Sequence, residues 1–389
     1  MGKSDHGSTK LELRELEPWP EQVDGAVLLN DLSATFSRHL ALLDGAADVM
    51  ALWVMFTHGF DAAKVSPRLG LLSPLPECGK TTALSLLGRL VPRPVLASNM
   101  SPAVVFRAIE EYGPTLLMDE ADTYLEQNDE FRGILNSGHT PDTANVWRCS
   151  GQDHEPKSFT TWAPMAIAKI GTLPDTLTTR SIIIPMRRKR PDEYVEKFDT
   201  ARHRHSVDEL ARKAARWAKE NLETLGQAKP EMPEELRNRA ADNWTPLLAI
   251  ADTAGGDWPE RGRLVAVMSC GGVAEATLQE QLLADIQDVF LQCQLDRISS
   301  NQLCGKLGCL EGRPWGRMEN GCIIAPSRLA SLLRPFGIKP HSIRIGQSTP
   351  KGYELKDFED AFARYLPEKR NTATSEEQQG VERSVQDAA

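Results

Sequence analysis

The stretch from Leu69 to Val91, LGLLSPLPECGKTTALSLLGRLV, decides the fold of this chain. It opens with a short apolar run that ends at Ser73-Pro74, which predicts a buried strand. Gly79-Lys80-Thr81 follows, and leucines at helical spacing come directly after it. A strand, a Gly-Lys-Thr turn and a helix are the parts of a phosphate-binding loop, in which N–H groups at the helix N-terminus face an anion.

One position departs from this pattern. In G-x-x-x-x-G-K-[ST] the first glycine would fall at Pro74, which has no backbone N–H and a fixed φ. The triplet alone is weak, because Gly2-Lys3-Ser4 repeats it with no predicted strand before it and no predicted helix after it. The N–H donors that matter lie mostly late in the loop, so we expect Pro74 to cost little binding and Pro76 to stiffen the turn.

We expect this loop to bind ATP together with Mg²⁺. Lys80 would reach the β- and γ-phosphates, and the Thr81 hydroxyl would bind the metal ion. The loop residues expected to contact the nucleotide are Pro76, Glu77, Cys78, Gly79, Lys80, Thr81 and Thr82.

A second pattern supports the first independently. The run TLLMDE predicts a buried strand that ends in two carboxylates, and it reaches Asp119 39 residues after Lys80. We expect Asp119 to complete the metal site with Thr81, and Glu120 to polarise the attacking water. The alternative is a strand followed by an acidic loop without chemistry. The letters DEAD at 119–122 do not indicate a DEAD-box helicase, because the Ser-Ala-Thr motif of that class is absent.

Further basic residues are candidates for roles in catalysis. Arg180 precedes the fifth predicted strand, where oligomeric ATPases place an arginine finger that contacts a neighbour's γ-phosphate; a surface salt bridge is the alternative. Lys169, at the end of the fourth strand, occupies a sensor position at which Asn or Thr is commoner. Arg237 or Arg239 would be a sensor arginine of the lid.

The composition bounds the class of protein. The 389 residues are 41% hydrophobic and 25% charged, with a mean hydropathy of -0.37, which is typical of soluble globular chains. The net charge of -9 means that any contact with DNA must come from a local patch. Seven scattered cysteines, without a C-x-x-C pair, fit a reducing cytoplasm. We expect no membrane span and no secretory signal.

Strands that alternate with helices predict a parallel sheet covered on both faces. We therefore expect an α/β chain with a P-loop NTPase (AAA+-like) core. The predicted parts are an N-terminal helical segment (1–65), the ATPase core (66–190), a helical lid (191–262), a winged-helix-like C-terminal domain (263–366) and a polar, disordered tail (367–389).

Two segments are candidates for contact with DNA. A predicted hairpin before the fourth strand carries basic and aromatic residues of the kind that grip single strands, Trp147, Arg148, His154 and Lys157; a plain surface hairpin is the alternative. The C-terminal domain offers four candidate phosphate contacts, although winged helices also serve as protein docks. These are Arg328, Arg334, Lys339 and Arg344.

Several long stretches carry a resemblance to a known family. They include CGKTT, LLMDEAD, APMAIAKIGTLPDTLTTRSI, RAADNWTPLLAIADTAGGDWP, GRPWGRM and KGYELKDFEDAFARYLP. From about Leu40 to Pro367 the chain resembles the domain of unknown function 3631, found in bacterial and mobile-element proteins beside primase modules. The resemblance implies an AAA+-like P-loop ATPase with a lid and a winged helix, similar to plasmid and phage replicative helicases. It supplies no reaction. We expect no primase within this chain, so a separate primase would be a partner.

Three functions follow for comparison. The leading hypothesis is a ring-forming DNA motor of plasmid or phage replication, a helicase-like homo-oligomer such as a hexamer. The second is an ATP-gated DNA-binding or assembly switch, for example a loader, regulator or defence component, without unwinding activity. The third, a small-molecule P-loop kinase, is disfavoured because such kinases generally lack the Asp-Glu pair and a long helical lid.

Overall fold

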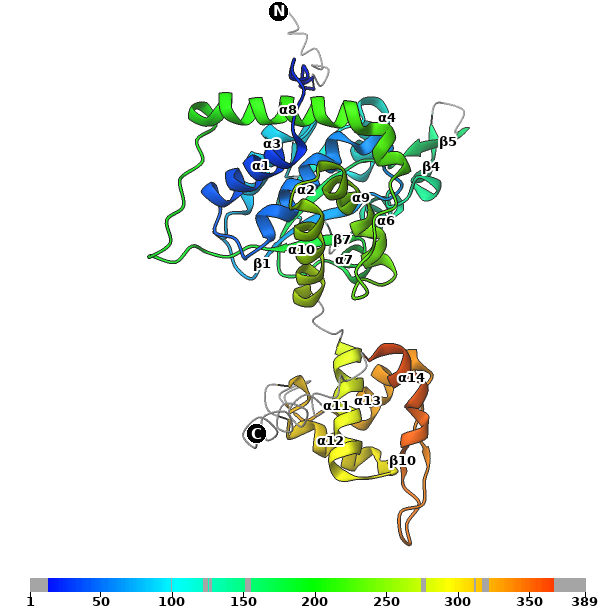
Figure 1. Ribbon diagram of the computed structural model, residues 1–389. Helices are drawn as coiled ribbons and strands as arrows, with labels where there is room; N and C mark the ends of the chain where they lie inside the picture. The colour runs from blue at the N-terminus through cyan, green and yellow to red at the C-terminus, as the bar shows by residue number, and fades with distance from the viewer. Residues whose placement is uncertain are drawn as a thin grey trace, which may run out of the picture. The chain divides into compact units, whose positions relative to one another are not determined.

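The computed structural model describes residues 13–98, 100–121, 125, 128–150, 155–273, 278–310, 313–316 and 322–366. The chain forms two compact units, Met1–Val273 and Ala274–Ala389 (Figure 1). The boundary therefore lies later than the predicted start of the C-terminal domain at 263. The reason is that α10 (Trp258–Val273) packs on α9 (Arg239–Ala254), so both helices belong to the first unit. The predicted tail, 367–389, lies outside the described residues.

The first unit is built on a five-stranded parallel sheet, which confirms the predicted α/β class. Its strands lie in the order β2-β3-β6-β1-β7. They are buried apolar runs because helices cover both faces of the sheet. The strands are β1 (Arg68–Ser73), β2 (Pro94–Ala97), β3 (Thr115–Met118), β6 (Met165–Ile170) and β7 (Ser181–Pro185).

Alternating residues of these strands enter two separate cores. On β7, Ile182 and Ile184 join the core on one face of the sheet, whereas Ile183 joins the core on the other. The first face is covered by α3, and the second by α4 and α6. The connecting helices are α3 (Lys80–Leu90), α4 (Pro102–Tyr112), α6 (Asp129–Ser137) and α7 (Asp175–Thr178).

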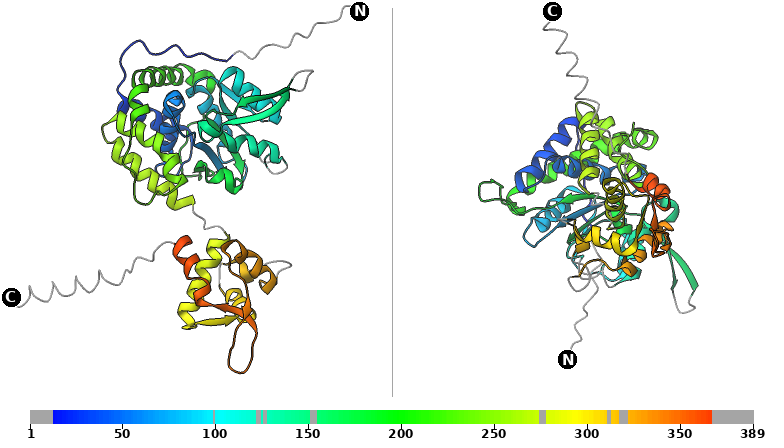
Figure 2. Two further views of the ribbon diagram at one scale, coloured as in Figure 1. Left: turned by 90° about the vertical axis from the view of Figure 1, so that its right-hand side faces the viewer. Right: turned by 90° about the horizontal axis from the view of Figure 1, so that it is seen from below.

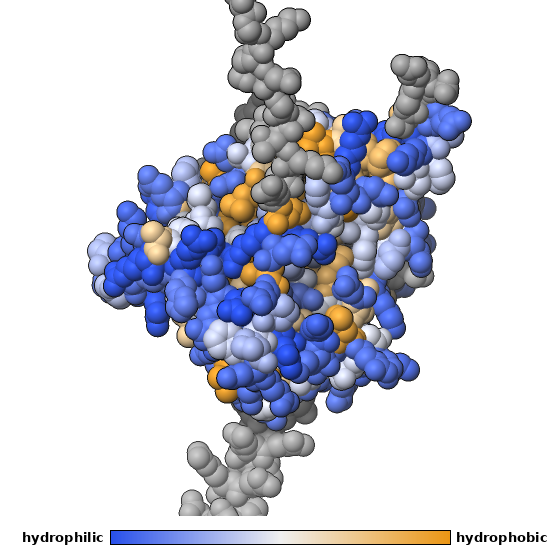
Figure 3. Space-filling model, turned by 90° about the horizontal axis from the view of Figure 1, so that it is seen from above, coloured by the Kyte–Doolittle hydropathy of each residue, from blue (hydrophilic) through white to orange (hydrophobic). Residues whose placement is uncertain are grey.

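The N-terminal helices α1 (Gly25–His39) and α2 (Ala46–His58) belong to the same core as the loop helix α3. Nearly every residue of α2 is buried, and Trp53 is completely enclosed. α8 (Thr200–Gln227), α9 and α10 complete this core. Seen from the side of α8, the surface is mostly hydrophilic with small hydrophobic patches (Figure 3). Within the described residues, no helix has the length and apolarity needed to cross a membrane.

The predicted hairpin is confirmed. β4 (Asn145–Ser150) and β5 (Glu155–Thr160) form a two-stranded antiparallel ribbon that projects from the sheet (Figure 2). Its base is fixed by Phe159, whose ring centroid lies 4.8 Å from that of Phe106 on α4.

The second unit combines helices with a small antiparallel sheet of order β8-β10-β9. Trp315, Tyr353 and Phe358 are fully buried in its core. In chain order its elements are α11 (Leu278–Cys293), β8 (Arg297–Ser299), α12 (Ser300–Gly308), α13 (Pro326–Leu333), β9 (His341–Ser342), β10 (Lys351–Glu354) and α14 (Glu359–Tyr365). Short 3-10 helices occur in both units at Phe60–Ala62, Pro141–Thr143, Pro314–Gly316, Arg334–Phe336 and Leu355–Asp357.

Candidate functional site

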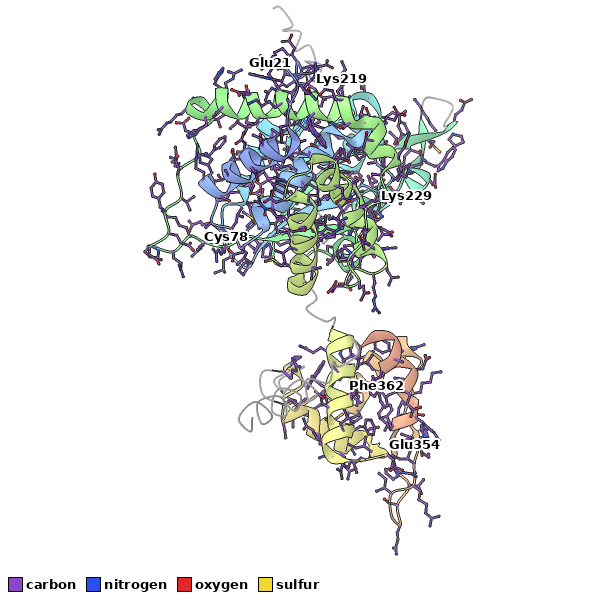
Figure 4. The ribbon with its side chains drawn as sticks, viewed as in Figure 1. Glu21, Cys78, Lys219, Lys229, Glu354 and Phe362 are labelled. Carbon is purple, nitrogen blue, oxygen red and sulfur yellow. The ribbon has the colours of Figure 1, made fainter. Side chains whose placement is uncertain are left out.

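The loop between β1 and α3 has the backbone of an anion cradle. Gly79 adopts φ 81°, a left-handed conformation that glycine reaches without the strain of a side chain. Among the described side chains, none caps the start of α3, although a helix begins with unpaired N–H groups. Those groups are therefore available to a bound anion. Cys78 is 4% exposed and anchors the middle of the loop (labelled in Figure 4).

Lys80 lies at the first position of α3, beside the end of β1. Its Nζ donates a 2.5 Å hydrogen bond to Oγ of Ser73. Ser73 in turn donates to the carbonyl of Leu75 at 2.8 Å, so the serine links the lysine to the loop backbone. This contact holds the ammonium group at the strand–helix junction, where the sequence predicts contact with phosphate.

The two predicted metal ligands meet, although they are far apart in the sequence. Oγ1 of Thr81 donates to Oδ2 of Asp119 at 3.3 Å. The backbone N–H of Asp119 is fixed at the end of β3 by a 2.9 Å bond to the carbonyl of Ala97. Hydroxyl and carboxylate oxygens are ligands that Mg²⁺ accepts, and Mg²⁺ usually keeps waters and substrate oxygens as further ligands. This donor set fits Mg²⁺. Among the described residues, there is no group of three or more His, Cys, Asp or Glu that could hold a metal ion by itself.

Two residues near this site have strained backbones. Glu120 has φ 52° and Glu77 has φ 62°, in the left-handed region that residues with side chains rarely adopt. The backbone N–H of Glu120 donates to Oδ1 of its neighbour Asp119 at 2.9 Å, and its side chain is exposed. Such strain costs about 1–3 kcal/mol per residue and clusters at functional sites.

Lys169 lies on β6, the strand between β1 and β3. It pairs in register with Leu72, so it is close to the carboxyl end of the sheet. Only 4% of the residue is exposed, and its Nζ donates to the carbonyl of Ile170 at 3.3 Å. The residue predicted as a sensor is thus near the edge that carries the loop.

Arg180 and Arg239 lie at the opposite edge of the sheet from the loop, where the parallel strands begin. The carbonyl of Arg180 accepts from the N–H of Arg68, the first residue of β1, at 3.0 Å. Since β1 and β7 are parallel and β1 has six residues, about 17–20 Å separates this edge from the loop. Nη1 of Arg239 donates to Oγ1 of Thr179 at 3.0 Å.

The predicted lid sensor therefore needs correction. α9 begins beside α7, and this places Arg239 next to Arg180 instead of over the loop of its own chain. Arg237 is an exposed residue just before that helix. The spacing of apolar residues in α9 did not indicate at which edge of the sheet the helix begins.

The edge with Arg180 carries uncompensated positive charge. Burial and then the neighbouring Arg239 lower the pKa of Arg180. Burial likewise lowers the pKa of the enclosed Arg68, to about 9, which leaves it protonated at neutral pH. His139 is buried nearby, and burial lowers its pKa too. In the described part of the chain, neither Arg180 nor Arg239 forms an ion pair, so both remain able to bind an anion.

Arg188 is a loop residue that the sequence analysis missed. Its Nε donates to the carbonyl of Pro76 at 3.0 Å, and its guanidinium lies 3.4 Å from the Glu77 carboxylate. In the sequence, the basic run at 187–190 marked the end of the predicted ATPase core and gave no sign of a contact with the loop. Its position just after the last strand was the available signal, because β7 lies beside β1.

A cavity of about 300 Å³ lies close to the loop. Its apolar walls come from the segment before α2, from the end of β7 and from α10, and Asp44 and Ser269 add polar groups. Pro185 of this lining pairs with Leu72 of β1, the strand that leads into the loop. The apolar lining residues include Leu43, Ala46, Ile184, Pro185, Val265 and Met268.

The hairpin presents part of the predicted set of residues. Trp147 is 66% exposed. Arg148 faces Lys157 across the two strands, and like charges in such a pair repel. Arg148 is also engaged by Glu130 at 2.6 Å. His154 lies outside the described residues.

Comparison with known proteins places the chain in a family. A family model described as "Protein of unknown function (DUF3631)" matches residues 185–365. The "Uncharacterized 28.9 kDa protein in xis 5'region" of Saccharopolyspora erythraea is 34% identical over 187 residues, 47% of this chain and 69% of that protein. The chain belongs to this family. The matched range is narrower than the predicted one, and the loop and Asp119 lie before it.

Two solved structures of one protein were also found. They are described as "The A form apo structure of NrS-1 C terminal region-CTR" and "The A form apo structure of NrS-1 C terminal region-CTR(305-718)". Their TM-scores are 0.44 and 0.39, with 11% and 10% sequence identity. Each alignment covers 87% of this chain and 77% of the other.

Proposed function

We propose that this protein is a P-loop ATPase of the AAA+-like type that binds ATP with Mg²⁺ and hydrolyses it. The observation that carries the proposal is the 3.3 Å contact between Thr81 and Asp119. It joins the loop to the carboxylate strand at one sheet edge, with Lys80 beside them. Counted along the chain, the strands are arranged 2-3-4-1-5, the order expected of the AAA+-like core that the sequence resembles.

The residues would divide the reaction among them. ATP supplies the phosphoryl group that is transferred to water. The N–H groups from Glu77 to Thr82 and the Lys80 ammonium would hold the phosphates, because charge in a preorganised site is stabilised strongly. Thr81 and Asp119 would hold Mg²⁺. Glu120, exposed beside Asp119, would orient the attacking water and accept its proton. The cavity at Pro185 would take the nucleobase.

Arg180 would act only on a neighbouring copy. It lies at the edge opposite to its own loop, so it cannot reach a nucleotide bound there. With Arg239 beside it, it offers a pair of cations to the γ-phosphate of an adjacent subunit. The ATPase site is thus incomplete in one chain, and we propose a homo-oligomeric ring such as a hexamer.

The work driven by ATP is proposed to be movement along DNA in plasmid or phage replication. The exposed Trp147 and the facing pair Arg148 and Lys157 support contact with a single strand, since an indole stacks on any base. The engagement of Arg148 by Glu130 favours the second candidate, an ATP-gated switch that binds DNA or assembles without unwinding it. A separate primase remains a proposed partner.

The first test is the ATPase rate with and without single-stranded DNA. Lys80→Ala and Glu120→Gln should each lower kcat by about 100-fold or more, because each removes a group that acts on the transferred phosphoryl group or the water. Lys219→Ala, an exposed lysine of α8, is the matched control and should leave the rate unchanged. Wild-type hydrolysis equal to that of Lys80→Ala would refute the ATPase. Hydrolysis that DNA does not accelerate, with no unwinding of a forked duplex, would refute the motor.

Mixing variants tests the role of Arg180. Lys80→Ala has a defective loop but an intact Arg180, whereas Arg180→Ala has the reverse. Each alone should be inactive, and mixed oligomers should regain activity where an intact loop meets an intact arginine. A mixture as inactive as its components, in assemblies shown by light scattering to contain both chains, would exclude action between subunits.

A further inference from the structure

One stretch of the second unit is unusual in its charge. From Cys322 to Tyr353 the sequence contains no Asp or Glu, although the chain has 54 acidic and 45 basic residues in 389. At that frequency such a stretch would hold about four acidic residues. It contains five basic ones, Arg328, Arg334, Lys339, Arg344 and Lys351. The stretch comprises α13 and the β9–β10 hairpin, so positive charge is gathered on consecutive elements of one unit.

The exposed stripe of α13 is small and polar. Leu329, Leu332 and Leu333 are buried in the unit's core. The other side carries Ser327, Ala330 and Ser331 at helical spacing, and with Arg334, Lys339 and Pro340 they line a surface hollow of about 440 Å³. Short side chains let a helix approach a flat surface closely, and the hydroxyl groups can both donate and accept hydrogen bonds.

Four cations on these elements are available to bind another molecule. Elsewhere in the unit, Arg297 is paired with Asp296 at 2.9 Å, and Lys356 with Glu354 at 2.5 Å. In contrast, none of four basic side chains forms an ion pair within the described part of the chain, namely Arg334, Lys339, Arg344 and Lys351. Their charge is therefore available to an anionic surface.

The β9–β10 loop extends this surface. It projects from the body of the unit, next to Glu354 at its base (Figures 1 and 4). The N–H of Ile343 bonds to the carbonyl of Pro350 at 3.0 Å, and that of Ile345 to Ser348 at 3.0 Å, so the loop is a structured hairpin. Arg344 is exposed between these bonds.

We propose that α13 and the β9–β10 loop form a site for double-stranded DNA. α13 lies in the major groove with Ser327 and Ser331 toward the base edges, because an α-helix fits that groove. The four unpaired cations contact phosphates on both sides of the helix. A single strand is a poorer ligand, since the exposed large apolar side chains among the described residues of this unit, Leu291, Leu295 and Ile323, include no aromatic on which bases could stack.

The test is the salt dependence of binding of the full chain, without nucleotide, to a fluorescent duplex of mixed sequence. Four phosphate contacts give a slope of log K against log salt of about -3.6, which is about a 150-fold loss of affinity from roughly 50 to 200 mM. Arg334→Ala with Lys339→Ala should halve this slope. Arg297→Ala, which removes a cation already paired, is the control and should keep the wild-type slope.

Two results would overturn the site. One is no affinity for the duplex at low salt, which would point to a protein as ligand of this face. The other is a slope unchanged in the Arg334/Lys339 variant but reduced by Trp147→Ala with Arg148→Ala. The proposed DNA site is separate from the proposed ATPase site, because it contains no residue of the loop between β1 and α3. Lys80→Ala should bind the duplex like wild type, so failure of one proposal leaves the other standing.

Discussion

The buried imidazole of His58 should make the free energy of unfolding depend on pH, by an amount that can be worked out from the structure. It ends α2, and its Nε2 donates a 2.7 Å hydrogen bond to the carbonyl of Leu90, the last residue of α3. Burial lowers the pKa of the imidazole to about 4, against a weaker opposing effect of the hydrogen bond. We predict that His58→Gln, whose amide can donate to the same carbonyl, removes a pH-dependent part of the folding free energy.

Proton uptake determines whether the stability rises or falls with pH. The unfolded chain protonates this histidine near pH 6.5, whereas the folded chain keeps it neutral down to about pH 4. In that window the unfolded state binds more protons, so the stability present above pH 6.5 is lost as the pH falls. The two pKa values give a loss of about 2.5 kcal/mol between roughly pH 7.5 and 4.5. Since part of the residue reaches solvent, this is an upper limit.

The assay is urea unfolding followed by tryptophan fluorescence at both pH values. Seven of the eight tryptophans lie in the first unit, so the signal reports mainly on that unit. The free energy of unfolding of wild type should fall more than that of His58→Gln, by up to the stated amount. His205→Gln, at an exposed histidine of α8, should behave like wild type. Equal losses in wild type and His58→Gln would refute the reasoning.

Three further predictions concern the loop and a partly buried ion pair. Gly79→Ala and Gly171→Ala both place a side chain at φ 81°, so each should lower the free energy of unfolding by about 1–2 kcal/mol. Only Gly79→Ala should also abolish nucleotide binding, as measured in a titration with fluorescent ATP. Asp48→Asn should lower the free energy of urea unfolding by about 3 kcal/mol, because it removes the nearer and more buried of the two carboxylates that pair with the Arg261 guanidinium, whereas Asp44→Asn, at an exposed residue, should not. Arg188→Ala should weaken ATP binding several-fold while the melting temperature changes little, since this arginine is exposed and contacts Pro76 and Glu77 of the loop; equal affinities would show that the loop needs no such support.

The sequence predicted the elements of the first unit well, because the signals there are local. Apolar runs bounded by Pro and Gly mark β1 and β3, and Pro102 at the first turn marks the start of α4. The meeting of Thr81 with Asp119 was also predictable, since parallel strands bring their carboxyl ends to one edge of a sheet. The hairpin followed from the polar, turn-rich stretch before β6.

Features that depend on tertiary packing were not predictable in this way. The N-terminal helices are apolar, but nothing in their periodicity shows that α2 packs on the loop helix through His58 and Leu90. The same holds for α10, most of which falls within the predicted C-terminal domain although the helix packs on α9 of the first unit. Arg239 was assigned to the wrong edge because a helix pattern specifies the buried face but not the partner on which it lies.

The placement of strand ends shows how the proposed chemistry is divided within one chain. On β6, Ile170 pairs with Ser73 and Ile167 with Met118, so β1 reaches further along the sheet than β3. Thr81, the second residue of α3, lies close enough to Asp119 to form a hydrogen bond despite that offset. The parallel arrangement that unites these residues also sends Arg180, which precedes β7, to the opposite edge. A parallel sheet cannot bring both ends of neighbouring strands to one site, so a reaction that needs both Lys80 and Arg180 requires two chains.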